Sequence, residues 1–260
     1  MPGLKVIIIG GGLSGALLAN GLINNDINVA IYERDIEETK REGYQIRLGE
    51  PSLTAFRACL PASQVSTIEQ KFGVSSKSNK SQKSLIAPCI FSTKMKVILD
   101  LGKLPTYSVS TAISRIVLRN FLVDPVKEKG AIEFGKGFDH YEIIEDGEGC
   151  EKVRVHFSDG ETEVCDILVG ADGSASRINK QLGLNNIQEI KSHFVFVCKG
   201  SLPPKRVDQL PTRLREGPIL LFHKGVSLYY ALYMPPKHGS DKKLNVLDYD
   251  HTEASFYWSL

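Results

Sequence analysis

Residues 5–35 of the chain read KVIIIGGGLSGALLANGLINNDINVAIYERD. The β-branched run Val6–Ile9 predicts a strand buried on both faces, and it leads straight into three glycines. The small apolar residues of 16–22 predict a helix, and the apolar run Val29–Tyr32 predicts a second strand. Strand, tight turn, helix and strand within about 30 residues are typical of the βαβ unit of a dinucleotide-binding fold.

The turn itself, residues 10–15, fits the pattern GxGxxG. In this pattern the first glycine permits the sharp turn, the second leaves room for a pyrophosphate against the backbone, and the third lets the helix pack closely on the sheet. The start of the helix offers free N–H groups and a positive dipole end to the phosphates. The residues predicted to meet the nucleotide here are Gly10, Gly12, Leu13, Ser14 and Gly15.

Glu33 ends the second predicted strand, 23 positions after Gly10. A carboxylate at this place accepts hydrogen bonds from a ribose diol and repels a 2′-phosphate, so NADP is disfavoured at this turn. The neighbouring Arg34 weakens the argument against a 2′-phosphate. The pattern does not choose between FAD and NAD, because both contain adenosine diphosphate.

A second turn-rich segment follows a predicted hairpin much later in the chain. Residues 153–157 alternate in polarity, Ser158-Asp159-Gly160 is typical of a tight turn, and residues 162–169 predict another strand. That strand leads into GADGSASRINKQLGL, residues 170–184, where Ser174 and Ser176 are candidate caps of a short helix. Taken alone, an Asp-Gly pair in such a place is often only a turn.

The combination of motifs resembles one family, the FAD-dependent aromatic-ring monooxygenases of the para-hydroxybenzoate and salicylate hydroxylase type. The matching segments are GxGxxG with its Tyr-Glu-Arg strand end, GADGxxSxxR from Gly170, and SVSTAISRIVLRNFL, residues 108–122, which resembles the family's helix with an Arg followed by Leu-Arg. The resemblance implies contacts with the flavin nucleotide from Arg115, Asp172 and Gly173. It also implies that Arg47, within the loop and helix of residues 43–60, lies near the isoalloxazine. A solvated helix face for Arg115 and a surface position for Arg47 are the alternatives.

The resemblance implies an α/β fold with two parts. The first is a Rossmann-like FAD-binding domain, residues 1–72 and 104–183. The second is a smaller β-sheet substrate domain, residues 73–103 and 184–260, in which several aromatic residues could line an apolar pocket. The sequence departs from the family where Asn179 replaces a second basic residue, and where the later Gly-Asp motif is missing. We therefore expect a truncated chain or fragment whose substrate domain is incomplete.

The resemblance also implies a reaction. In this family NAD(P)H reduces the flavin, O2 adds to give a flavin hydroperoxide, and one oxygen atom hydroxylates or epoxidises an aromatic or lipophilic small molecule. The cofactor carries this chemistry, so no catalytic side chain is predicted. The alternatives are an NAD-dependent dehydrogenase and a catalytically inactive FAD-binding fragment.

Composition limits the remaining classes of function. The 260 residues carry a net charge of +2, which gives no reason to expect a nucleic-acid partner, and no run approaches the about 20 apolar residues of a transmembrane helix. A cytoplasmic location is expected, with membrane association through a missing C-terminal segment left open. The five scattered cysteines predict free thiols, and the six histidines show neither HxH nor HExxH, so no metal site is predicted. Residues 74–84, VSSKSNKSQKS, predict an exposed mobile loop.

Overall fold

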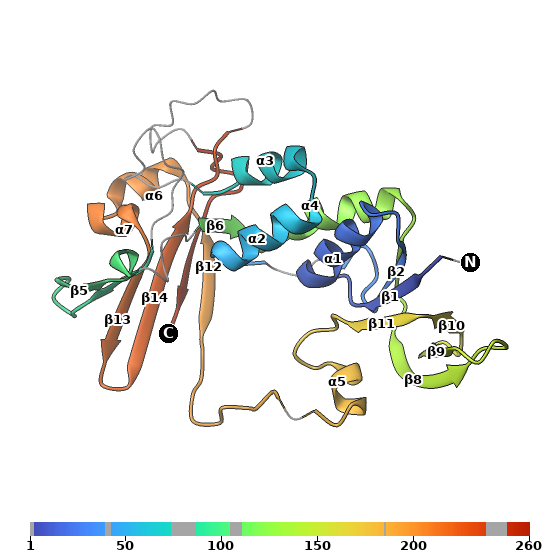
Figure 1. Cartoon of the computed structure of the whole chain (residues 1–260). Helices are drawn as coiled ribbons and strands as arrows, with labels where there is room; N and C mark the ends of the chain where they lie inside the picture. Colours follow the sequence, from blue (N-terminus) through green and yellow to red (C-terminus); the bar gives the residue numbers. More distant parts are fainter. Residues whose placement is uncertain (1–2, 40–42, 74–86, 105–110, 185, 238–248) are drawn as a thin grey trace. The chain divides into compact units, whose positions relative to one another are not determined.

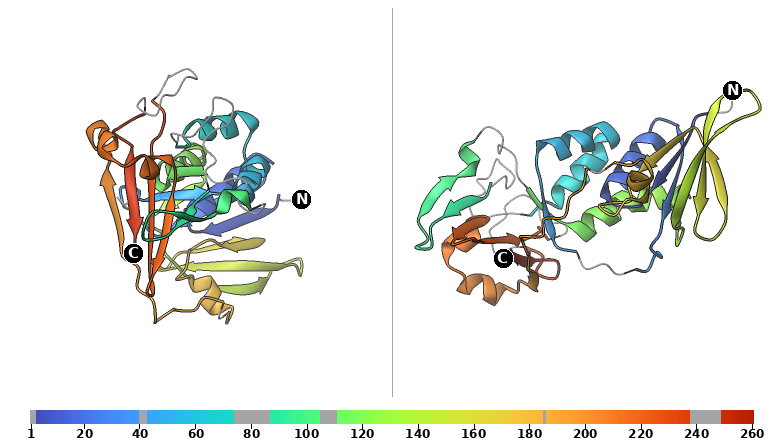
Figure 2. Two further views of the ribbon diagram at one scale, coloured as in Figure 1. Left: turned by 90° about the vertical axis from the view of Figure 1, so that its left-hand side faces the viewer. Right: turned by 90° about the horizontal axis from the view of Figure 1, so that it is seen from below.

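The computed structural model describes residues 3–39, 43–73, 87–104, 111–184, 186–237 and 249–260 (Figures 1 and 2). The chain divides into two compact units. The first consists of Met1–Glu42, Phe56–Ala62 and Leu118–Ile190, and the second of Gly43–Ala55, Ser63–Val117 and Lys191–Leu260. Each unit has its own sheets and its own buried core.

The first unit combines a parallel sheet, helices and a small antiparallel sheet. Its strands and helices are β1 (Lys5–Ile9), α1 (Leu13–Ile23), β2 (Asn28–Glu33), β7 (Ile132–Phe134), β8 (Phe138–Glu145), β9 (Glu151–Phe157), β10 (Thr162–Cys165), β11 (Ile167–Gly170) and α5 (Arg177–Gln181). Two further helices, α2 (Glu50–Cys59) and α4 (Arg115–Glu128), contribute residues to both units. The sequence-based prediction of strand, glycine turn, helix and strand is confirmed by β1, α1 and β2.

The parallel sheet has the order β11-β1-β2-β7, with β1 and β2 in its centre. Side chains alternate across this sheet. Val6 and Ile8 of β1 pack on one face with Ala19 of α1 and Val126 of α4. Successive side chains of a strand point to opposite faces of the sheet. A strand whose two faces are both covered therefore needs apolar residues at nearly every position, as β1 has.

The opposite face of the parallel sheet is covered by the antiparallel sheet β10-β9-β8. The buried residues between these layers are Ile7, Ile9, Tyr32, Phe138, Val155, Phe157, Cys165 and Ile178. The rings of Tyr32 and Phe157 meet at 4.5 Å between centroids. The right-hand view of Figure 2 shows the twist of the yellow-green strands β8, β9 and β10.

The single strand predicted for residues 162–169 is in fact two strands. β10 pairs antiparallel with β9, whereas β11 pairs parallel with β1. Asp166 separates them: its backbone N–H donates to the Lys5 carbonyl, and its Oδ2 accepts the Lys5 N–H at 2.7 Å. Its other oxygen accepts from the Lys152 amine. These contacts turn the chain from one sheet into the other, which an uninterrupted β pattern did not reveal.

The second unit is dominated by a six-stranded sheet of order β12-β15-β14-β13-β4-β5, and a separate two-stranded ribbon joins β3 and β6. Its elements are β3 (Gln45–Leu48), α3 (Ala62–Gln70), β4 (Cys89–Phe91), β5 (Val97–Asp100), η1 (Leu101–Lys103), β6 (Thr111–Ser114), β12 (Val197–Ser201), α6 (Pro204–Gln209), α7 (Thr212–Glu216), β13 (Ile219–His223), β14 (Val226–Tyr233) and β15 (Ser255–Ser259). Figure 1 shows β13 and β14 as a long hairpin.

The core of the second unit holds two fully buried tyrosines whose hydroxyls are satisfied by the backbone. Tyr249 donates to the Leu202 carbonyl at 2.8 Å, and Tyr233 donates to the Lys71 carbonyl at 3.1 Å. Burial raises the pKa of both phenols. Tyr233 is therefore a core residue and not the lining of an open pocket.

The helix expected over residues 108–122 begins later than predicted. Residues 111–114 form β6, which pairs antiparallel with β3, and α4 then runs from Arg115 to Glu128. Residues 108–110 lie outside the described residues. Thr111 and Ile113 are β-branched and buried, which favours the strand over the first turn of a helix.

The mixed α/β class with a parallel nucleotide-binding sheet is confirmed. The domain division at residues 72, 104 and 183 stays a prediction; the contacts within the chain group β3 and β6 with the second unit. The predicted loop at residues 74–84 lies outside the described residues. Among the helices that the structure describes, none has the length and apolar character needed to cross a bilayer.

Candidate cofactor site

The glycine turn after β1 is held in a conformation that side chains would not tolerate. Gly10 has φ +107°, in the region that favours glycine, and its N–H donates to the Tyr32 carbonyl at 2.9 Å. A Cβ on Gly10 would lie 2.4 Å from the Ala171 carbonyl oxygen, and one on Gly15 would lie 2.1 Å from the Gly10 carbonyl oxygen. The first and third glycines thus allow the turn, helix α1 and the end of β11 to approach one another.

The middle glycine differs from its neighbours because it faces open space. A Cβ on Gly12 would meet nothing within 4 Å. Gly12 is also the N-cap of α1, where no side chain caps the helix and where the first turn carries no acidic residue. The start of α1, at Leu13 and Ser14, therefore offers backbone N–H groups and a positive dipole end beside free space, as an anionic phosphate requires.

Glu33 ends β2 next to this turn. The residue is only 9% exposed, and its two carboxylate oxygens accept backbone N–H groups, Oε2 from Gly11 at 2.8 Å and Oε1 from Asp35 at 3.0 Å. A carboxylate has about four lone-pair positions, so acceptor capacity remains for a ribose hydroxyl. The contact with Gly11 was not predicted, although Gly11 stands inside the motif. Only the pairing of β1 with β2 brings the two residues together.

The GADG turn lies directly beside the glycine turn, although some 160 positions separate them in the sequence. β11 pairs with β1 in the register Ile9↔Gly170, and Ala171 donates its N–H to the Ile9 carbonyl at 2.8 Å. The Cα of Asp172 lies 3.0 Å from the position of a Cβ on Gly10. The GxGxxG and GADG motifs, which only the family resemblance had linked, therefore lie at the same edge of the parallel sheet. This edge is formed by the carboxyl ends of its strands.

Asp172 has one satisfied and one unsatisfied oxygen. Oδ2 accepts the N–H of Arg177 at 2.8 Å, at the start of α5, whereas Oδ1 is buried and has no hydrogen-bond partner within the described residues. An unsatisfied buried carboxylate oxygen is costly unless a ligand or water donates to it. Gly173 follows with φ +84°. Ser176 caps α5 by accepting the Asn179 N–H at 2.9 Å, which confirms one of the two predicted caps.

These features together fit the adenosine diphosphate part of a dinucleotide. The helix start and the open space at Gly12 suit a pyrophosphate, Glu33 suits a ribose, and Asp172 offers an unused acceptor. Arg34, beside Glu33, is exposed and lies 4.0 Å from Asp35. This contact does not place the Arg34 side chain at the glycine turn. A contact between Arg34 and the nucleotide therefore stays a prediction.

The remaining two predicted residues lie together in the second unit. Arg47 is on β3, paired with Ala112 of β6, and Arg115 follows β6 directly and donates its N–H to the Tyr44 carbonyl at 3.1 Å. Burial lowers the pKa of the Arg47 guanidinium, while its hydrogen bond to Tyr229 acts in the opposite direction. The ring of Tyr229 meets Tyr257 edge-on at 5.9 Å. Arg47 is therefore a half-buried cation beside Tyr229, and its place at the flavin stays a prediction.

The comparison with protein families gives one match, to an FAD binding domain over residues 3–209. Among curated proteins, the dual O-methyltransferase/FAD-dependent monooxygenase elcB of Phaeosphaeria nodorum is 33% identical over 180 residues, which are 69% of this chain and 19% of elcB. The chloroplastic zeaxanthin epoxidase of Solanum lycopersicum is 24% identical over 257 residues, which are 92% of this chain and 35% of that enzyme. The part of the chain that matches covers 19% to 43% of the length of these curated relatives.

Solved structures agree on the fold. A Photorhabdus luminescens protein, provisionally described as an FAD-containing monooxygenase, superimposes with a TM-score of 0.71 at 25% identity, covering 98% of this chain and 62% of that one. Klebsiella pneumoniae HpxO, solved with FAD and uric acid, superimposes with a TM-score of 0.67 at 18% identity, covering 99% of this chain and 56% of HpxO. At that level of identity HpxO supports the fold alone.

Proposed function

Because the chain belongs to the FAD-binding-domain family, we propose that it is the FAD-binding portion of a flavin-dependent monooxygenase. The first unit holds the adenosine diphosphate part of FAD at the glycine turn. The observation that carries the proposal is the junction of β1 and β11, where Gly12, Glu33 and Asp172 present free space, a carboxylate and an unsatisfied acceptor at one sheet edge.

Each residue of this junction has a distinct part in the proposal. The N–H groups at the start of α1 bind the pyrophosphate, and Gly12 keeps the space free for it. Glu33 accepts a ribose hydroxyl while its two backbone contacts hold the carboxylate in place. Asp172 accepts a hydrogen bond from the ligand through Oδ1, because Oδ2 is already engaged by the Arg177 N–H.

Arg47 and Arg115 are proposed to contact the flavin nucleotide, as the family resemblance implies. The burial that lowers the pKa of the Arg47 guanidinium supports this role, because a positive charge with little access to water is stabilised by the negatively charged groups of a nucleotide. Exchange of either arginine for methionine keeps most of the apolar length of the side chain and removes the charge. We expect each exchange to weaken FAD binding, with Arg47 showing the larger loss.

Bound FAD supplies the redox chemistry, and the protein orients it and excludes water. The proposed reaction uses NAD(P)H as the reductant and O2 as the oxidant, and transfers one oxygen atom to an aromatic or lipophilic small molecule. Curated relatives named FAD-dependent monooxygenases and zeaxanthin epoxidases support this class of reaction. An NAD-dependent dehydrogenase is the second candidate, because the glycine turn alone suits either dinucleotide.

The test compares FAD binding by the chain and by Gly12→Ala. The added methyl meets no protein atom within 4 Å, so the variant keeps its fold, but the methyl occupies the space proposed for the pyrophosphate. Crowding of this kind costs about 1–3 kcal/mol, which corresponds to a loss of affinity of roughly 5- to 150-fold. Gly147→Ala is the matched control, since a Cβ there also meets nothing and Gly147 lies in the loop between β8 and β9.

Flavin fluorescence during titration measures this binding, with NAD titrated in parallel. The proposal predicts FAD binding by the chain and by Gly147→Ala, and a clear loss in Gly12→Ala. Equal FAD affinity in all three proteins would refute the assignment of the glycine turn. Binding of NAD in place of FAD would favour the dehydrogenase. Oxidation of NADPH coupled to O2 uptake, in protein reconstituted with FAD, tests the monooxygenase reaction separately.

A further inference from the structure

The outer face of the antiparallel sheet carries a cluster of side chains that the cofactor site does not use. In β8 and β9 the residues Tyr141, Val153 and Val155 pack against the core, so their neighbours point to the other face. The strand register pairs His140 with His156 directly. Because side chains alternate, Glu142 lies on the same face as His140, two positions further along β8.

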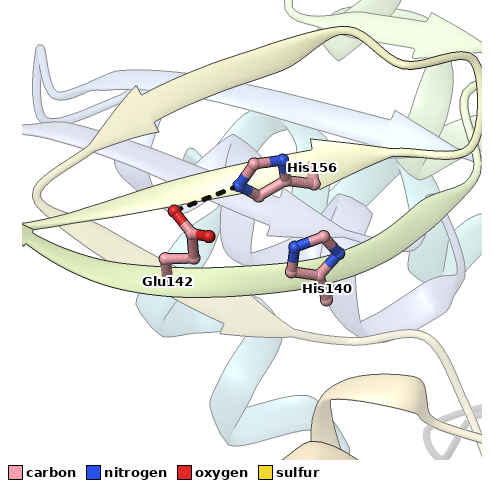
Figure 3. Close-up of side chains that lie close together, drawn as sticks. All are labelled: His140, Glu142 and His156. Atoms are coloured by element: carbon pink, nitrogen blue, oxygen red, sulfur yellow. Dashed lines mark ion pairs between the residues drawn. The ribbon is translucent and has the colours of Figure 1, made fainter.

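These three residues form a group with the composition of a transition-metal site. One ring nitrogen of each histidine and one oxygen of Glu142 lie within 4.8 Å of one another. The Nε2 atom of His156 is 3.4 Å from Oε2 of Glu142, and the rings of His140 and His156 stack with centroids 4.1 Å apart. Figure 3 shows the three side chains projecting from the same face of two neighbouring strands.

One of the distances within the cluster matches the spacing that a zinc ion imposes on its ligands. Zinc binds imidazole nitrogen and carboxylate oxygen at about 2.0–2.2 Å, so neighbouring ligand atoms in a tetrahedral site are about 3.4 Å apart. The separation of His156 and Glu142 already has this value. The rings of His140 and His156 lie nearly parallel, at 7° to each other, so one of them must turn before both can direct a nitrogen at the same ion. His140 and Glu142 are exposed, which leaves their side chains free to turn.

Two further observations point to a ligand at this place. First, Nε2 of His156 is buried and has no hydrogen-bond partner within the described residues, although it faces the carboxylate of Glu142. Second, Nδ1 of His140 lies 3.0 Å from Oδ2 of Asp139. A carboxylate on one ring nitrogen holds the proton there and leaves Nε2 as the metal-binding atom, an arrangement common to metal-bound histidines.

One positively charged side chain near the cluster would compete with a metal ion for the Glu142 carboxylate. Nη1 of Arg154 lies 3.7 Å from the same oxygen of Glu142 and would compete with a metal ion for it. Both side chains are about half exposed, so water screens this pair and it is weak.

We propose that His140, Glu142 and His156 bind a divalent transition-metal ion of the zinc class, with water completing the coordination. Imidazole and carboxylate ligands suit zinc, and a site with three protein ligands keeps one open position. The ion would join β8 to β9 on the face opposite the core. The site is separate from the glycine turn and does not depend on FAD binding.

Calorimetric titration of the untagged, chelator-treated chain with ZnCl2 tests the proposal. We expect one ion per chain, and on the order of 100-fold weaker binding or more in His140→Ala and in His156→Ala, because each loses a ligand. His223→Ala removes an exposed histidine of β13 in the second unit and is the matched control. Arg154→Gln removes the competing cation, so its affinity should rise by at least about twofold.

Unfolding of the metal-free variants, followed by circular dichroism, establishes that each one retains the fold. The proposal is supported if zinc binding disappears in the two cluster variants and persists in His223→Ala. It is overturned if the wild-type chain binds no zinc at micromolar concentration. Equal binding by all variants would overturn it as well, because the ion would then sit elsewhere on the surface.

Discussion

Glu33 is expected to stabilise the nucleotide-binding edge even without ligand, and Glu33→Gln tests this. The two side chains have nearly the same shape. Both carboxylate oxygens of Glu33 accept backbone N–H groups, from Gly11 and Asp35. A glutamine has one oxygen and one NH2 group, so in either orientation its NH2 would face an N–H donor.

The magnitude follows from that mismatch. Glutamine loses one hydrogen bond to a charged group, and it leaves one N–H without an acceptor, either the buried N–H of Gly11 or the half-buried N–H of Asp35. Together these effects cost about 3 kcal/mol of the free energy of unfolding. For a chain of this size, that corresponds to a fall in the melting temperature of roughly 6–12 °C.

Thermal unfolding followed by circular dichroism, without FAD, measures the effect. Glu148→Gln is the matched control, because Glu148 is exposed in the loop between β8 and β9 and its exchange should leave the melting temperature within about 2 °C. An unchanged melting temperature in Glu33→Gln would show that Glu33 does not hold the glycine turn. The reasoning about this edge would then fail.

Three further outcomes are expected. Gly10→Ala should lower the free energy of unfolding by at least about 2 kcal/mol in urea, because φ is +107° and the new Cβ would lie 2.4 Å from the Ala171 carbonyl oxygen; stability equal to wild type would contradict the geometry of the turn. Ser176→Ala should cost about 1 kcal/mol, measured in the same way, because it removes the acceptor for the Asn179 N–H; a neutral effect would mean that the cap is dispensable. Cys150 is exposed and should react with Ellman's reagent in the folded chain at pH 8, whereas burial raises the pKa of Cys165 to about 11, so Cys165 should react only after unfolding; rapid labelling of Cys165 in the native chain would argue against its burial.

The βαβ unit could be predicted from sequence because its determinants are local. Two short apolar runs, an apolar helix and glycines at fixed spacing all lie within residues 5–33, and β1, α1 and β2 follow them closely. The proximity of Asp172 to this turn could be expected only by resemblance. It depends on the parallel pairing of β11 with β1, which no local pattern specifies.

The misassigned elements share a physical cause. The strand predicted over residues 162–169 is divided because Asp166 makes tertiary hydrogen bonds that change its sheet. The helix expected from residue 108 begins at Arg115 because residues 111–114 pair with β3. In both cases a partner distant in the sequence decided between two conformations that the local residues allow.

The histidine cluster is a further feature that local sequence patterns do not reveal. His140 and His156 are 16 positions apart and match no local metal-binding pattern. Only the antiparallel register of β8 and β9 makes them direct neighbours, with Glu142 beside them. A search by sequence spacing does not find ligands that are joined across strands.

A crystal structure of the chain grown with FAD tests the central claim most directly. The account predicts the pyrophosphate at the start of α1, against Gly12, with a ribose hydroxyl on the Glu33 carboxylate and a ligand or ordered water donating to Oδ1 of Asp172. Electron density for FAD elsewhere on the chain, with the glycine turn empty, would contradict it.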